Sequence, residues 1–114
     1  MLRLLIVGAG GIGGYYAARL LHAGHEVVLT ARGAHLAALQ ENGLTVQYGD
    51  EMWSFPVQAM DHSAVVARYS PDDFDVVLVT LKSTATETML AELGPWLYHG
   101  KVPVLSLQNG VDNE

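Results

Sequence analysis

A run of glycines near the N-terminus is the feature of this sequence with the clearest chemistry. Residues 8–13 follow the pattern G-x-G-x-x-G. In such a loop the first glycine permits a tight strand-to-helix turn, the second lets the backbone approach a pyrophosphate, and the third lets the helix pack closely on the strand. A tight turn without a ligand would not need so many glycines, which weaken the start of a helix. We therefore predict a dinucleotide phosphate site at Gly8, Ala9, Gly10, Gly11, Ile12 and Gly13.

A second chemical signal is the arginine that follows the next predicted strand. Arg32 lies 24 residues after Gly8, near the spacing of about 20 at which NAD-binding loops place an Asp or Glu for the ribose 2′-hydroxyl. A guanidinium instead suits a 2′-phosphate, through forked and charge-assisted hydrogen bonds. The pattern favours NADP over NAD as cofactor; the alternative is an ordinary solvated arginine at a strand end.

Two further polar residues, Lys82 and Asn109, follow apolar runs that predict strands. In an open α/β sheet, ligands bind outside the carboxyl ends of the strands. An ammonium there could contact a cofactor phosphate or a substrate carboxylate, and an amide could bond a ribose or a carbonyl. By position alone, a binding role and an ordinary polar loop residue are about equally good interpretations of Lys82 and of Asn109.

Strands and helices are predicted to alternate around these residues. Apolar runs predict strands at 2–7, 26–30, 75–81 and 101–107, and helices at 12–21, 34–42 and from 84 onward. Residues 44–48 and 52–57 predict a β-hairpin with its turn near Gly49, and 63–68 a short helix in the connection 59–71. We expect a capping box at Thr84–Glu87 and the end or a kink of that helix at Gly94-Pro95. The fold class is thus α/β: a Rossmann-like, doubly wound, mostly parallel sheet with a β-hairpin insertion.

The composition limits the classes of protein to which this chain can belong. The 114 residues predict one domain, 1–114, and a chain that is 50% hydrophobic can bury a core. Only 16% of residues are charged, so we expect part of the surface to meet another domain or subunit. A net charge of −6 argues against nucleic acid as a binding partner.

The apolar run at 2–7 is too short for a signal peptide or membrane span, which predicts a cytoplasmic protein. His22 and His25 lack further ligands, and we expect no metal.

Several segments together resemble one enzyme family. They are Gly8–Gly14, Ala23-Gly24-His25-Glu26-Val27, Ala31-Arg32-Gly33, Val79-Thr80-Leu81-Lys82 and Leu105-Ser106-Leu107-Gln108-Asn109-Gly110-Val111. With this spacing the chain is similar, from end to end, to the N-terminal domain of ketopantoate reductases (2-dehydropantoate 2-reductases). The resemblance implies NADPH-dependent reduction of ketopantoate to pantoate, in pantothenate and coenzyme A synthesis.

The resemblance also implies roles for individual residues. The glycine loop, Arg32 and Lys82 would bind NADP, and Asn109 would lie beside the nicotinamide and the substrate. Residues 83–86 depart from the family, in which an aromatic residue or a glutamine often follows the lysine. The helical second domain of the family, which supplies the catalytic lysine, is absent from these residues, so no catalytic residue is assigned.

The predicted partner is a small 2-keto acid that serves as substrate. The sequence is also compatible with a homo-oligomer. Two alternatives remain: a reductase of another 2-keto acid, and a non-catalytic NADP-binding or redox-sensing module.

Overall fold

The structure, a computed structural model, describes residues 1–8, 11–80 and 83–106. Its elements are β1 (Arg3–Val7), α1 (Gly11–His22), β2 (Glu26–Thr30), α2 (Gly33–Asn42), β3 (Leu44–Tyr48), β4 (Glu51–Phe55), β5 (Gln58–Met60), α3 (His62–Arg68), a 3-10 turn η1 (Pro71–Asp73), β6 (Val76–Val79), α4 (Ser83–Tyr98) and β7 (Val104–Ser106).

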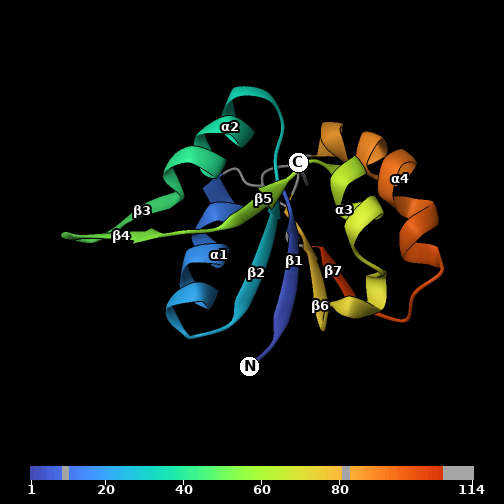
Figure 1. Ribbon diagram of the computed structural model, residues 1–114, viewed down its shortest axis with the longest axis horizontal. Coiled ribbons are helices and arrows are strands. Elements are labelled where there is room, and N and C mark those ends of the chain that lie inside the picture. Colours follow the sequence, from blue (N-terminus) through green and yellow to red (C-terminus); the bar gives the residue numbers. More distant parts are fainter. Residues whose placement is uncertain (9–10, 81–82, 107–114) are drawn as a thin grey trace.

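Five of the strands form one parallel sheet in the order β5-β2-β1-β6-β7. The chain starts at the central strand β1, moves outward through β2 to β5, and then crosses to β6 and β7 on the other side (Figure 1). The direction of winding therefore reverses between β1 and β6, which is where doubly wound sheets bind their ligands. The predicted α/β, doubly wound fold is confirmed.

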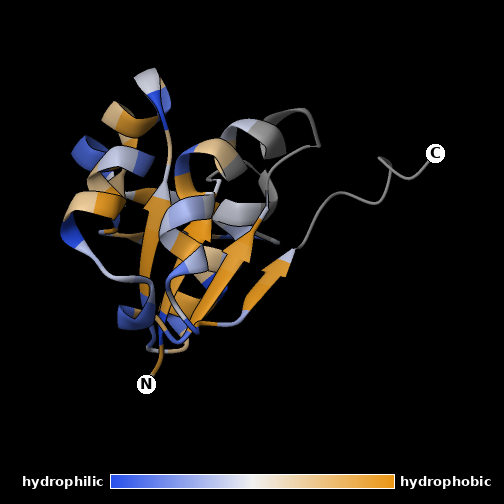
Figure 2. Ribbon diagram, turned by 90° about the vertical axis from the view of Figure 1, so that its right-hand side faces the viewer, coloured by the Kyte–Doolittle hydropathy of each residue, from blue (hydrophilic) through white to orange (hydrophobic). Residues whose placement is uncertain are grey.

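Two apolar cores cover the two faces of this sheet. On one face, Leu4, Ile6 and Leu29 pack against α1, α2 and the hairpin formed by β3 and β4. On the other face, Leu5 and Val77 pack against α3 and α4. Figure 1 shows these two groups of helices on opposite sides of the strands. The strands of the sheet are hydrophobic along nearly their whole length (Figure 2), as expected for a parallel sheet covered on both faces.

The predicted hairpin is present and covers α1. β3 and β4 pair antiparallel, and Gly49 in their turn has a φ of 64°. Along the hairpin, residues facing the core alternate with exposed ones: Trp53 and Phe55 pack against α1, whereas Met52 is exposed. The Trp53 indole stacks on the imidazole of His22, with ring centroids 4.1 Å apart.

Several details differ from expectation. The strand β5 lies inside the segment expected to be an irregular connection, where Ala59 and Met60 are buried beside β2. A strand of three residues shows no periodicity, so only the free edge of β2 explains it. The strands β6 and β7 are shorter than their apolar runs. Helix α4 already begins at Ser83, and the side chains of the expected capping box lie outside the described part of the chain.

Helix α4 also continues through Gly94-Pro95 to Tyr98 without ending there. Proline normally breaks a helix because it lacks an N–H and crowds the preceding turn. Tertiary contacts on both sides of Pro95 hold the helix to the rest of the fold. Leu93 is fully buried, and the Trp96 Nε1–H donates to the backbone oxygen of Tyr69 at 2.8 Å.

The edge strand β7 carries apolar side chains that remain exposed. Val104 is 46% exposed and Leu105 is 53% exposed. No strand among the described residues pairs with its outer edge. An exposed apolar edge favours pairing with another chain. We therefore expect the 114-residue chain to self-associate as its concentration rises, measured by sedimentation velocity, and Leu105→Lys to shift it toward monomer. A chain that stays monomeric at all concentrations would contradict this prediction.

Candidate functional site

The end of β1 brings together residues from three strands. In the sheet register, Ile6 pairs with Leu29 and Val7 with Val79, so Gly8 follows β1 between the ends of β2 and β6. Gly8 is buried and has a φ of 100°, a left-handed conformation that favours glycine. This geometry supports the role predicted for the first glycine, which is to turn the chain from β1 toward α1.

Two threonine hydroxyls bond the peptide groups of Gly8. The Oγ1 of Thr30, at the end of β2, accepts the Gly8 N–H at 2.9 Å. The Thr80 hydroxyl, just after β6, donates to the Gly8 oxygen at 2.7 Å and lies 3.1 Å from the Val7 oxygen. Sequence reasoning did not single out either residue. The available signals were that each threonine stands at or near the end of an apolar run, which is common in strands, and that Thr80 belongs to one of the segments that carry the family resemblance.

The start of α1 packs tightly against the same glycine. A Cβ atom placed on Gly13 would lie 1.9 Å from the Gly8 oxygen and 2.6 Å from the Thr80 Oγ1. Real carbon and oxygen atoms do not approach this closely, so only glycine fits at position 13. This contact supports the role predicted for the third glycine, close packing of the helix on the strand.

Arg32 lies at the carboxyl end of β2 and is exposed. It occupies the N-cap position of α2 with an extended backbone, and its side chain makes no capping hydrogen bond. Within the described residues, no carboxylate forms an ion pair with it. Arg32 is therefore exposed at the carboxyl end of β2, where an anion can reach it.

The described part of the chain covers the predicted site only in part. Gly11 and Ile12 begin α1, so the glycine loop does open a helix at the end of β1. Ala9, Gly10, Lys82 and Asn109 lie outside the described residues. The structure thus brings Gly8 and Gly13 together and leaves the positions of those four residues as predictions.

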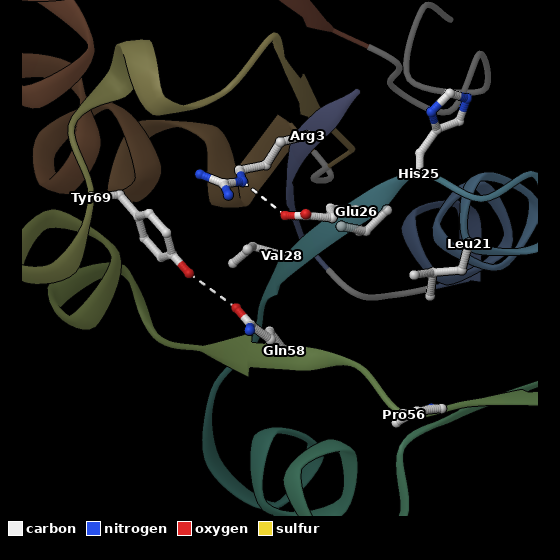
Figure 3. A pocket seen from close by; sticks show the side chains of 9 residues that line it. Arg3, Leu21, His25, Glu26, Val28, Pro56, Gln58 and Tyr69 are labelled. Carbon is white, nitrogen blue, oxygen red and sulfur yellow. Dashed lines mark hydrogen bonds and ion pairs between the residues drawn. The ribbon is translucent and has the colours of Figure 1, made fainter. Parts of the chain in front are cut away.

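A cavity of about 370 Å³ lies at the opposite end of the strands from Gly8, near the amino ends of β1, β2 and β5 (Figure 3). The Arg3 Nε–H donates to a Glu26 carboxylate oxygen at 2.9 Å, and the Tyr69 hydroxyl donates to the Gln58 Oε1 at 3.0 Å. The hydrogen bond and charge of Glu26 raise the pKa of Arg3 above its usual value. Since this cavity is remote from Gly8, it is not the predicted dinucleotide site.

The described residues contain neither a cluster of metal ligands nor a helix that could span a membrane. No group of three or more His, Cys, Asp or Glu side chains there could hold a metal ion. No helix in the same residues combines the length and apolar character needed to cross a bilayer.

The fold and the glycine loop together define a class. A strand, a G-x-G-x-x-G loop and a helix at the centre of a doubly wound sheet form a dinucleotide-binding domain of the Rossmann type. Residues 4–114 match the protein family described as ketopantoate reductase PanE/ApbA. The chain belongs to this family of oxidoreductases, as its sequence motifs predicted.

Individual relatives agree with this assignment. A 2-dehydropantoate 2-reductase of Mesorhizobium japonicum is 37% identical over 96% of this chain and 32% of its own length. The crystal structure of a PanE/ApbA family ketopantoate reductase from Ralstonia eutropha matches with a TM-score of 0.81 at 37% identity, over 98% of this chain and 36% of that one. A ternary D-mandelate dehydrogenase structure with NADH has a TM-score of 0.80 at 24% identity, which shows a shared fold. The chain spans about a third of the length of its curated relatives.

Proposed function

We propose that this chain is the NADP-binding domain of a reductase that converts 2-dehydropantoate to pantoate. The relatives named 2-dehydropantoate 2-reductase support the reaction. The observation that carries the choice of cofactor is Arg32, an exposed guanidinium at the end of β2. Thr30 and Ala31 precede it, and no carboxylate stands there to repel a 2′-phosphate.

The chain's own residues would hold the cofactor at its pyrophosphate and at its 2′-phosphate. The N–H groups at the start of α1 would bind the pyrophosphate, because a helix N-terminus presents free donors and a positive dipole end. Gly13 would keep α1 close enough to β1 for this contact. Arg32 would bind the 2′-phosphate with a forked pair of N–H groups. When bound, the nicotinamide supplies the hydride that reduces the keto group.

The substrate side of the proposal rests on Asn109, whereas Lys82 would add to the contacts with the cofactor. Both residues follow apolar runs that predict strands, and the cofactor would bind at the carboxyl ends of the strands. Lys82 would therefore contact a cofactor phosphate, and Asn109 would lie near the nicotinamide and the keto acid. We assign no catalytic residue within 1–114. In this proposal the acid that protonates the product is not one of these residues. We further propose that the complete reductase acts in the cytoplasm on a small 2-keto acid.

Direct titration tests the cofactor part of this proposal. We expect the chain to bind NADPH about 10- to 150-fold more tightly than NADH in calorimetry at low salt, from one forked guanidinium–phosphate contact. The assay for the reaction is NADPH oxidation by the complete reductase with ketopantoate, compared with pyruvate and other 2-keto acids. Equal rates with all of them would contradict ketopantoate as substrate, and equal binding of both cofactors would contradict NADP.

A further inference from the structure

Thr30 and Thr80 contact opposite sides of one residue in the predicted cofactor loop. They lie 22 and 72 residues from Gly8 in the sequence. The Thr30 hydroxyl oxygen accepts the Gly8 N–H, and the Thr80 hydroxyl donates to the Gly8 oxygen. Both peptide groups of the first loop glycine are thereby held by side chains from the two strands that flank β1.

We propose that the two hydroxyls are positioning groups for the pyrophosphate-binding loop, an inference that rests on the proposed cofactor function. A peptide group held in this way cannot rotate and turn its carbonyl oxygen toward a bound phosphate, where oxygen–oxygen repulsion would oppose binding. The Gly8 peptide groups are therefore already fixed before the dinucleotide binds, and less conformational entropy is lost on binding.

Strand pairing alone does not account for these hydroxyls. The backbone N–H of Thr80 already donates to the Val7 oxygen at 3.0 Å, so the sheet is paired there without the side chain. Thr30 is only 2% exposed, and a valine of the same shape would bury more favourably at that position. A valine would also leave the buried Gly8 N–H without its partner. The specific property of threonine at both positions is its bond to Gly8.

The test compares isosteric variants of the chain with three ligands. Thr80→Val and Thr30→Val remove one hydroxyl each, and Thr80→Ser retains it. The ligands are NADPH, NADH and adenosine 2′-phosphate, which has no pyrophosphate. We expect each valine variant to bind NADPH and NADH about 5- to 30-fold more weakly, by equal factors, from the loss of one buried hydrogen bond. Binding of adenosine 2′-phosphate, followed by NMR titration, should be unchanged, and Thr80→Ser should restore dinucleotide binding.

The control is Thr45→Val, which removes a hydroxyl from the exposed hairpin, where Thr45 Oγ1 lies 3.3 Å from Ser54 Oγ. Its ligand affinities should equal those of the unmodified chain. Should Thr80→Val fail to fold, the pair Thr80→Ala and Thr80→Ser makes the same comparison.

Three results would overturn the inference. If the unmodified chain binds the dinucleotides and the valine variants bind them equally well, the hydroxyls do not position the loop. If a valine variant loses all three ligands to the same extent, its hydroxyl has only a structural role. If the unmodified chain binds neither NADPH nor NADH, the proposed function fails, and the inference fails with it.

Discussion

A single methyl group at position 13 is expected to abolish dinucleotide binding. In Gly13→Ala the new Cβ would lie 1.9 Å from the Gly8 oxygen, so α1 or the end of β1 must move. Alanine would raise helix propensity by up to about 1 kcal/mol. Overpacking of this kind costs about 1–3 kcal/mol or more, so the steric effect wins. We expect no NADPH binding in calorimetry, and a free energy of unfolding lowered by about 1–2 kcal/mol in urea denaturation once the gain in helix propensity is subtracted.

The matched control is the same substitution in α4. A Cβ on Gly94 meets no atom within 4 Å. Gly94→Ala should therefore leave NADPH binding unchanged and alter the free energy of unfolding by no more than about 1 kcal/mol. A folded Gly13→Ala chain that binds NADPH normally would show that close packing of α1 on Gly8 is not needed for the site.

Removal of the Arg32 side chain is expected to erase the preference for NADPH. One forked, charge-assisted contact with phosphate is worth about 1.5–3 kcal/mol, which corresponds to about 10- to 150-fold in affinity. NADH has no 2′-phosphate, so its affinity should change little in Arg32→Ala. The fold should also tolerate this change, because Arg32 is exposed and its side chain does not cap α2. Calorimetric titration of both cofactors measures the two effects.

Three comparisons separate a local contact from the overall charge of the chain. Arg32→Lys keeps the charge but loses the forked geometry, and should bind NADPH with intermediate affinity. Arg68→Ala removes a charge from the exposed end of α3 and should leave the ratio of affinities unchanged. The loss in Arg32→Ala should shrink at high salt, where screening weakens the contact. If Arg32→Ala weakens NADPH and NADH alike, Arg32 does not bind the 2′-phosphate.

Features with local signals could be predicted from the sequence alone. The glycine spacing at 8–13 predicted the turn from β1 into α1, and the two runs around Gly49 predicted the hairpin. Apolar, β-branched runs alternating with helical periodicity predicted the doubly wound sheet. These signals are local because glycine conformation and side-chain periodicity act within a few residues along the chain. The chemistry proposed for Arg32 has the same origin, since it depends on one residue type at one strand end.

Contacts between distant residues were decided only by the tertiary structure. The strand β5 exists because β2 offers a free edge, and α4 passes Pro95 because Leu93 and Trp96 are held against the rest of the fold. The hydroxyls of Thr30 and Thr80 reach Gly8 only because a parallel sheet places the ends of β2, β1 and β6 side by side. No local pattern encodes a contact across 72 residues, so the sequence by itself could predict the loop but not the groups that hold it.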